Sequence, residues 1–600
     1  MSRFLARVED AAASIALLAM AILPLLEIGL RRAFGMGVPG SGPIVQHLVL
    51  WVGFLGAAVA ARDRKLLALA SSTFIPEGWP RRAANVVAAA VGSFVSILLA
   101  WGAVELVRSE HQVGSTIGAG IPTWIAQLAL PVAFGLIGAR LVWYAGSGWR
   151  PRALASLGLV AALVAIRTPA ILEGQPAWPW MVLIVLAGAL GAPIFVLLGG
   201  AAVALFMIDG ITPATVLIET YALSVSPTLP AIPLFTLAGF LLAEGGASAR
   251  LLRVFRAWFG WIPGGTAVVC AFLCSFFTVF TGGSGVTILA LGGVLYPALV
   301  KDGYRERFAL GLMTAAGSLG LVLPPSLPLI LYGVVAQIPI EDLFIGGILP
   351  GILLTTMVAA WGVREGVSSG ARRQPFDRRE ALTSIWAAKW ELAMPLVVLV
   401  SMFSGFATAV EASALVAVYA LAVQTLVHRD MSVRRDLLRV LTECAVVVGG
   451  VLVILGVAVG FTNYLVGAEV PAKMLAWSQQ NIGSRVVFLL ALNLFLIAVG
   501  WLMEIFAAIV VVVPLIVPLG AAFDIHPVHL GIIFIANLEL GFLTPLVGIN
   551  IFLASYRFNR PVLEVARASL PMMGILGLGV LLITYVPWLT LGLLELLGRT

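Results

Sequence analysis

Long apolar stretches separated by short polar segments run through most of the chain. Met181–Met207 and Ile575–Leu594 each contain no charged side chain. About twenty residues in an α-helix are enough to cross roughly 30 Å of hydrocarbon, so each stretch predicts a spanning helix. A transmembrane barrel would instead show alternating segments of about ten residues, and that pattern is absent. The sequence therefore predicts an all-helical, polytopic membrane protein.

The first part of the chain predicts four spans and their direction. The spans are expected at Ala11–Leu30, Ile44–Ala61, Ala84–Val107 and Ile121–Tyr144. Basic residues crowd the segments after the second and fourth spans, at Arg62, Arg64, Lys65, Arg81, Arg82, Arg150 and Arg152. Because cytoplasmic loops of membrane proteins carry an excess of Lys and Arg, we expect these loops and the amino terminus to be cytoplasmic.

Composition changes along the chain predict its domains. Residues 1–150 form a small four-helix domain, and residues 151–179 hold a connecting helix at Ala153–Ile166 and a linker. The large domain, 180–600, is interrupted far more often by Gly and Pro. A basic loop at Arg364–Glu391 divides it into halves at about 180–364 and 390–600.

The two halves of the large domain resemble each other. Tyr296–Gly333 can be laid over Val517–Ser555 with one residue of slippage. The superposition pairs Gly311 with Gly531, Gly320 with Gly541, and Pro324 with Pro545. An internal repeat is therefore expected.

Three Gly-rich or Pro-rich breaks interrupt otherwise spanning segments, at Thr281–Gly285, Leu323–Ser326 and Thr544–Gly548. An unpaired backbone group in hydrocarbon costs several kcal/mol, so such breaks survive only where protein, an ion or water satisfies them. The candidate site residues are Thr281, Gly282, Gly283, Ser284, Gly285, Gly320, Pro324, Pro325, Ser326, Gly541, Thr544, Pro545 and Gly548. Freed carbonyls and hydroxyls suit Na⁺, and half-helix amino termini suit an anion. The alternative is that these residues only kink and pack helices.

Four further polar residues have two interpretations each. Asn537 and Asn550 flank the third break, where each either binds an ion or caps a half-helix. Glu411 lies near the turn of an expected hairpin between Met394 and Val427, and Glu539 precedes the third break. Each carboxylate is either a direct ligand or an interfacial group.

Composition and charge exclude several other functions. Of 600 residues, 61% are hydrophobic and 11% are charged, which excludes a water-soluble fold. The net charge of +7 is explained by cytoplasmic loops, so no nucleic-acid partner is expected. No Lys follows a Gly, which excludes a phosphate-binding loop, and no H-E-x-x-H occurs, which excludes a zinc protease of that type. The cysteines, Cys270, Cys274 and Cys444, lie in apolar context as packing residues. We expect neither an enzyme nor a cofactor.

Six ordered motifs carry a family resemblance. They read IPLFTLAGFLLAEGG, FTGGSGVTI, GSLGLVLPPSLPLILYG, LFIGGILPG, AVEASALVAVYA and GFLTPLVGINIF. With the four-helix domain before them, they resemble tripartite ATP-independent periplasmic (TRAP) transporters in the form that fuses a small DctQ-like and a large DctM-like subunit. The resemblance covers nearly the whole chain.

The resemblance implies an elevator-type secondary transporter of the bacterial inner membrane. It would contain inverted repeats and two re-entrant helical hairpins, use a Na⁺ gradient, and receive a small organic acid from a periplasmic substrate-binding protein. The hairpin tips would be Thr281–Gly285 and Thr544–Gly548, and with the break at Gly320–Ser326 they would hold Na⁺ beside the substrate. The small domain and the first helices of the large domain would be the fixed scaffold.

The chain departs from the family pattern in two places. The first tip is usually close to S-G-S-S-V-A-D, whereas Thr281–Thr287 reads T-G-G-S-G-V-T and lacks the carboxylate. The second tip is usually T-P-P-V-G, and Leu546 replaces its second proline.

The alternatives to a binding-protein-dependent importer are a stand-alone Na⁺/anion symporter and, from another class, a membrane-embedded enzyme.

Overall fold

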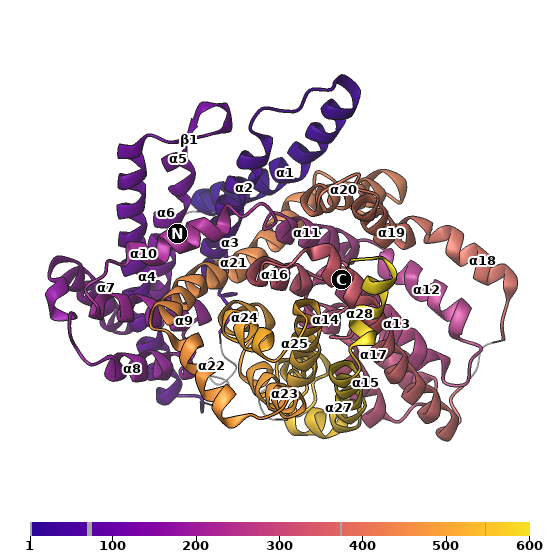
Figure 1. Ribbon diagram of the computed structural model, residues 1–600. Coiled ribbons are helices and arrows are strands. Elements are labelled where there is room, and N and C mark those ends of the chain that lie inside the picture. Colours follow the sequence, from indigo (N-terminus) through magenta and orange to yellow (C-terminus); the bar gives the residue numbers. More distant parts are fainter. Residues whose placement is uncertain (1–2, 69–74, 373–374, 546–547, 600) are drawn as a thin grey trace. The chain divides into compact units, whose positions relative to one another are not determined.

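The computed structural model describes residues 3–68, 75–372, 375–545 and 548–599 and is helical almost throughout (Figure 1). Twelve of the described helices are long and apolar enough to cross a membrane. Contacts divide the chain into two compact units: unit 1 holds Met1–Leu234 and Arg434–Ala472, and unit 2 holds Phe235–Val433 and Lys473–Thr600. This division differs from the domain boundaries expected near residues 150 and 180, which stay a prediction.

Unit 1 contains the four predicted amino-terminal spans. Its helices are α1 (Arg3–Phe34), α2 (Ser41–Leu50), α3 (Gly56–Arg62), α4 (Trp79–Val113), α5 (Thr123–Gln127), α6 (Ala129–Trp143), α7 (Trp149–Arg167), α8 (Ala177–Ala189), α9 (Ile194–Ile208), α10 (Ala214–Ser224) and α21 (Leu437–Gly467). A π-helical turn, η1 (Trp51–Leu55), joins α2 to α3, and a two-stranded sheet, β1 (Thr116–Ile117) with β2 (Ile121–Pro122), precedes α5. The short helix expected at Ala153–Ile166 is α7, which is several residues longer.

Glycines allow the long helix α21 to approach its neighbours closely within unit 1. A Cβ at Gly56 of α3 would overlap the carbonyl group of Ala445, and one at Gly449 would overlap the backbone of Ala57. Helices approach this closely in membranes where small residues line the contact. The carboxy-terminal segment Arg434–Ala472 is thus built into the same body as the amino-terminal helices.

Two stretches expected to be single spans are each two helices. Met181–Met207 is divided between α8 and α9, because Gly191 has a φ of +103° and Pro193 begins the next element without an N–H donor. Ile575–Leu594 is divided between α27, which ends at Tyr585, and α28, which follows Pro587. Both predictions were wrong because apolar length alone ignored these local breakers.

Unit 2 holds the interrupted helices. Its elements are most of α11 (Ala231–Glu244), α12 (Ala247–Phe259), α13 (Gly265–Thr281), α14 (Ser284–Lys301), α15 (Glu306–Ala316), α16 (Leu327–Ala336), α17 (Ile340–Ser368), α18 (Arg378–Ala387), α19 (Lys389–Phe403), α20 (Ala409–Ala422), η5 (Val423–Val427), most of α22 (Val470–Asn481), α23 (Arg485–Leu502), α24 (Ile505–Ala522), α25 (Pro527–Gly541), α26 (Ile549–Phe558), α27 (Val562–Tyr585) and α28 (Trp588–Leu596).

The same order of elements occurs twice in unit 2, at the predicted repeat. Each repeat begins with two helices that are separated by a two-residue tip, and these are α13 and α14 in the first repeat and α23 and α24 in the second. A short helix, a break, a second short helix and a long helix then follow, as α15 to α17 and as α25 to α27. The superposition of Tyr296–Gly333 on Val517–Ser555 places α15 and α16 over α25 and α26. The sequence similarity therefore reflects a repeated arrangement of helices.

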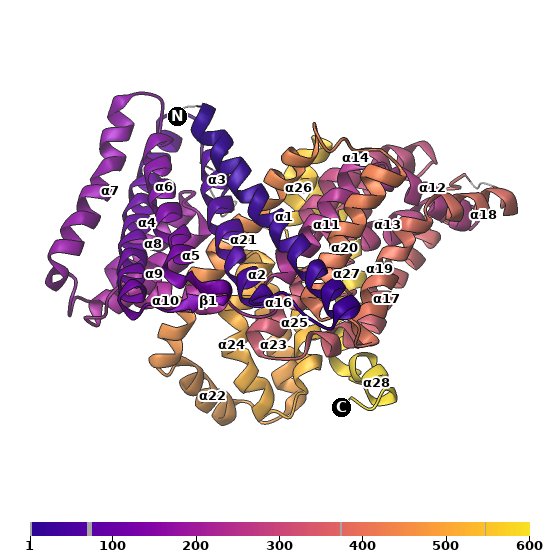
Figure 2. The same ribbon diagram turned by 90° about the horizontal axis from the view of Figure 1, so that it is seen from above.

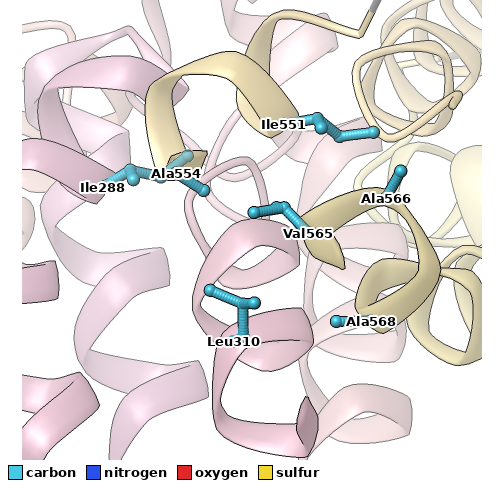
Figure 3. Packing of buried hydrophobic residues seen from close by; sticks show 7 residues of the cluster. All are labelled: Ile288, Leu310, Ile551, Ala554, Val565, Ala566 and Ala568. Carbon is cyan, nitrogen blue, oxygen red and sulfur yellow. The ribbon is translucent and has the colours of Figure 1, made fainter. Parts of the chain in front are cut away.

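The two repeats interlock. Helix α14 of the first packs on α26 of the second, and α24 of the second packs on α16 of the first. Figure 3 shows the core of one such junction, where side chains from α14, α15, α26 and α27 meet. Its buried members are Ile288, Leu310, Ile551, Ala554, Val565, Ala566 and Ala568. This reciprocal packing brings the interruptions of both repeats into the interior of one body.

Candidate ion and substrate site

The first predicted tip is the turn of a helical hairpin. Helix α13 ends at Thr281, and α14 begins at Ser284. At the other end of the pair, Thr266 Oγ1 donates to Asp302 Oδ2 at 2.6 Å, so the two helices run back along each other. Gly282 has a φ of +65°, and a Cβ there would overlap the side chain of Leu327. The turn therefore requires glycine at position 282.

Hydroxyl groups satisfy one another behind this tip. The Oγ1 atoms of Thr278 and Thr287 are 2.8 Å apart, and those of Thr281 and Thr287 are 3.3 Å apart. Thr278 Oγ1 also lies 2.8 Å from the carbonyl oxygen of Gly317, just after α15, where the second break begins. The position at which the family pattern has a carboxylate thus holds a neutral hydroxyl in a buried network.

The second break separates α15 from α16 and is mostly buried. Gly320 packs against α13, since a Cβ there would overlap the carbonyl oxygen of Ser275. The Pro324–Pro325 peptide bond is cis, and Ser326 Oγ donates to the carbonyl oxygen of Leu321. The predicted residues Gly320 to Ser326 therefore line a non-helical segment whose backbone is freed from helical pairing.

The third predicted break separates α25 from α26, and it is not a hairpin tip. Helices α25 and α26 pack on other helices of the described part of the chain rather than on each other. Gly548 donates its N–H to the carbonyl oxygen of Thr544 at 3.1 Å, and Pro545 lies between them. The buried Thr544 Oγ1 has no hydrogen-bond partner among the described residues. Leu546, the second departure from the family pattern, lies outside the described residues.

The second hairpin is formed by α23 and α24, and its tip is Met503–Glu504. Phe488 near the start of α23 stacks on Phe523 just after α24, with ring centroids 4.2 Å apart, so the helices run back along each other. The carboxylate of Glu504 accepts from the N–H of Phe506 at 2.9 Å and caps α24. Sequence reasoning missed this tip. The available signal was one carboxylate between two spans of high hydropathy.

One hydrogen bond joins groups that the sequence placed in different halves. Ser284 Oγ at the first hairpin tip donates to Asn550 Oδ1 of α26 at 2.6 Å. Asn550 Nδ2 in turn lies 3.4 Å from the carbonyl oxygen of Thr314 in α15. Gly285 also faces the side chain of Leu553 in α26. The amino termini of α14 and α26 therefore meet, and the positive ends of their dipoles lie together.

Glu539 connects the second repeat to the second break, between α15 and α16. Its side chain on α25 is buried and lies beside the backbone amides of Leu321 and Val322. Neither carboxylate oxygen makes a hydrogen bond of ordinary geometry within the described part of the chain. A buried carboxyl group without a firm partner is costly unless it binds a proton or a cation.

The other candidates lie elsewhere. Asn537 donates to Asn493 Oδ1 at 2.6 Å, so it faces α23 rather than the Ser284–Asn550 contact. Close packing accounts for Gly541, where a Cβ would lie 2.7 Å from Gly500 Cα. Glu411 caps α20 in a reciprocal arrangement with Thr408, whose N–H donates to Glu411 Oε2 at 2.8 Å. The structure thus gives a capping role to Glu411 in the expected hairpin between α19 and α20.

Paired helical hairpins and broken helices that meet inside one membrane-embedded body are the architecture of secondary transporters. The family comparison is more specific. The model for the tripartite ATP-independent periplasmic transporter DctM component matches residues 180–589, and the model for the DctQ component matches residues 20–150. The chain belongs to this family, and it carries both components in one polypeptide. The expected resemblance is confirmed.

Curated relatives agree with this assignment. The isethionate TRAP transporter permease DctMQ of Oleidesulfovibrio alaskensis is 31% identical over 91% of this chain and 87% of its own length. The C4-dicarboxylate TRAP transporter large permease DctM of Pseudomonas aeruginosa is 32% identical over 67% of this chain and 94% of its own. The sialic acid TRAP transporter large permease SiaM of Vibrio cholerae is 31% identical over 62% and 86%. The chain is a multi-pass membrane transporter and not an enzyme.

Proposed function

We propose that this chain imports a small organic acid, coupled to Na⁺, across the bacterial inner membrane. As a TRAP permease, the chain works with a periplasmic substrate-binding protein. The observation that carries the finer proposal is the Ser284–Asn550 hydrogen bond, which joins the first hairpin tip to the amino terminus of a broken helix from the other repeat. The charge distribution of the loops supports a cytoplasmic amino terminus.

Na⁺ as the coupling ion is supported by the kind of ligand available. The interruptions offer backbone carbonyls, hydroxyls and carboxylates, which are hard oxygen ligands. No cluster of three or more His, Cys, Asp or Glu side chains that would hold a transition metal occurs in the described residues. The proposed ligands come from Thr281–Gly285, Gly320–Ser326, Thr544, Pro545, Gly548 and Glu539, and to these we add Glu504 at the second hairpin tip. No other cofactor is proposed.

An acidic substrate is supported by the helix amino termini at the site. Helices α14 and α26 start beside each other, and Leu327 at the start of α16 lies against Gly282. Backbone N–H groups at such ends favour negative charge. Some relatives are named for isethionate, C4-dicarboxylates and sialic acid, which are acids, and others are named for ectoine. The solute class is therefore proposed to be a carboxylate or similar organic acid.

We also propose an elevator-type movement of unit 2. Both hairpins and the breaks between α15 and α16 and between α25 and α26 belong to unit 2, whereas close glycine contacts tie the helices of unit 1 together. A site built wholly within one body can move with that body, so unit 1 would act as the fixed scaffold.

The experiment is uptake of a labelled organic-acid panel into proteoliposomes, with and without an inward Na⁺ gradient and the cognate binding protein. Uptake that needs both supports the proposal and identifies the substrate class. Uptake with Na⁺ alone would establish the stand-alone symporter instead. Binding-protein-dependent uptake that is indifferent to Na⁺ would overturn the coupling ion while leaving the family role intact.

A further inference from the structure

Two helices of unit 2 turn away from the apolar helices to which they are joined. Helix α12 makes an angle of 76° with α11, and α18 makes an angle of 61° with α19. Both bends occur at breaks of only a few residues, at Gly245–Gly246 for the first and Ala388 for the second. Where α11 and α19 run along the bilayer normal, helices bent from them this sharply lie closer to the plane of the bilayer.

The two bent helices form a single surface, which we call the α12–α18 platform. Arg253 of α12 forms two hydrogen bonds with the carboxylate of Glu380 on α18, at 2.6 and 2.9 Å. Trp258 Nε1 also donates to the carbonyl oxygen of Ala381 at 3.2 Å. Segments more than a hundred residues apart in the sequence are therefore held side by side (Figure 2).

Large apolar side chains are exposed on this platform. Leu382 and Trp386, one turn apart on α18, are 67% and 72% exposed. Further exposed rings come from both helices and their flanks, and they are Trp258, Trp261, Phe376 and Trp390. Phe376 packs edge-on against Trp261. Tryptophan concentrates at membrane–water interfaces, where its apolar body and N–H group are both accommodated, so a bilayer surface suits this group better than bulk water.

Basic side chains accompany the exposed rings. Arg378 and Arg379 start α18, and no carboxylate of the described residues forms an ion pair with either. Lys389 Nζ lies 3.6 Å from the centroid of the Trp386 ring and likewise has no carboxylate partner in the described part. Arg372 is exposed just before them. Aromatic residues combined with uncompensated cations match the chemistry of an anionic lipid surface.

A buried ion-pair cluster fixes the platform to unit 2. Arg250 of α12 pairs with the fully buried Glu391 of α19 at 2.6 Å and with Asp430 at 2.7 Å. Asp430 also accepts from the N–H of Gly246, at the bend before α12. The platform is therefore attached rigidly to the helices behind it, so lipid bound to the platform would constrain the depth of those helices.

From these observations we propose that the α12–α18 platform lies in the interface of one leaflet and binds the headgroups of anionic phospholipids. Leu382 and Trp386 enter the acyl boundary, and Arg378, Arg379 and Lys389 bind the phosphates. The proposal goes beyond solute transport and does not depend on the solute. It commits to bilayer lipid as the partner, because the exposed Leu382 and Trp386 and the basic pair Arg378–Arg379 occur on the same helix.

The test places a bimane label at Leu382→Cys in the full chain. The three native cysteines, Cys270, Cys274 and Cys444, are fully buried, so the new thiol is the accessible one among the described cysteines. The protein is reconstituted in phosphatidylcholine vesicles that contain brominated phosphatidylglycerol or, at the same mole fraction, brominated phosphatidylcholine. Thr383→Cys, one residue along, provides the matched position, and iodide measures access from water.

We expect the Leu382 label to be quenched by brominated lipid and protected from iodide, with the reverse at Thr383. Brominated phosphatidylglycerol should quench more strongly than brominated phosphatidylcholine. Arg378→Gln with Arg379→Gln should reduce that preference at least about fivefold, which is the factor that the loss of about 1 kcal/mol at a single basic residue would give. Arg434→Gln with Arg435→Gln, another exposed basic pair, should leave it unchanged. Equal quenching by both lipids, or iodide access at Leu382, would overturn the proposal.

Discussion

Neighbouring glycines at the first hairpin tip have different surroundings. Gly282 has a φ of +65° and touches Leu327, whereas the nearest atom to a Cβ at Gly283 would be 3.8 Å away. An L residue in the left-handed region costs roughly 1–2 kcal/mol even without a clash. Only one of the two glycines is therefore required by the backbone and its neighbours.

Gly282→Ala should lower both the thermal stability and the solute uptake of the reconstituted protein, because alanine combines a strained φ with a clash against Leu327. Gly283→Ala is the matched control and should keep the native melting temperature within a degree or two. Thermal unfolding in detergent and initial uptake rates measure both effects. Equal behaviour of the two variants would contradict the described geometry of the tip.

The bond between Ser284 and Asn550 can be tested by a double-mutant cycle. Ser284→Ala leaves the buried Asn550 Oδ1 without its donor, which should cost about 1–3 kcal/mol of unfolding free energy. Asn550→Ala should then add less in the Ser284→Ala background than in the native one, with a coupling of about 1 kcal/mol. Denaturant or thermal unfolding of the four proteins gives the coupling, and strict additivity would mean that the two side chains do not interact.

At the scale of elements, the helix ends at the interruptions differ in how they are capped. Gly282 in the left-handed conformation ends α13, α16 starts after Ser326 without a side-chain cap, and Glu504 accepts from Phe506 to start α24. Thr408 and Glu411 together cap the start of α20, which lies outside the interruptions. Some of these capping residues are also proposed ion ligands and others are not. Capping and ion binding therefore have to be tested with separate variants.

Glu504 allows capping to be separated from charge. Glu504→Gln retains a side-chain oxygen that accepts from Phe506, so thermal stability should be close to native. Glu504→Ala removes the cap and should cost about 1 kcal/mol. If the carboxylate binds the coupling ion, Glu504→Gln should also raise the Na⁺ concentration for half-maximal uptake several-fold. An unchanged Na⁺ dependence in Glu504→Gln would leave Glu504 with a capping role alone.

The joint between α12 and the segment after η5 should depend on pH. Burial opposes ionisation of Asp430, but hydrogen bonds from Arg250 and from the N–H of Gly246 outweigh it and lower the pKa of Asp430. A lowered folded-state pKa gives stability that is present above the unfolded value of about 3.9 and lost as pH falls through the folded value. Asp430→Asn should therefore melt earlier than the native chain at pH 6. The difference should shrink below about pH 4, and a constant difference would exclude this linkage.

At the scale of the whole molecule, the sequence predicted what depends on local composition. Apolar length identified the four first spans, and the run T-G-G-S-G identified the first tip, because small residues allow a tight non-helical turn. The tip at Met503–Glu504 has no glycine, and Glu504 supplies the cap instead, so composition did not reveal it. The Ser284–Asn550 contact depends on how the repeats interlock, which no local pattern encodes.

Helix packing within unit 1 predicts that the two parts of a chain cut at Gly174 stay associated. Gly174 lies in an exposed turn between α7 and α8, with a φ of +69°. Helix α4 before the cut packs on α8, α9 and α10 after it, and all four belong to unit 1. A chain divided there keeps the buried apolar contacts that hold the unit together, and it loses only a connection.

Two separately expressed parts, 1–174 and 175–600, should therefore co-purify from membranes through a tag on either one. Gly102→Leu in the first part should abolish this association, because a Cβ at Gly102 of α4 would lie 2.7 Å from the Pro213 carbonyl carbon, just before α10. Gly135→Leu is the control, since no atom lies within 4 Å of a Cβ at that position of α6. Failure of the native parts to associate, or equal association with Gly102→Leu and Gly135→Leu, would show that these contacts do not join the two parts.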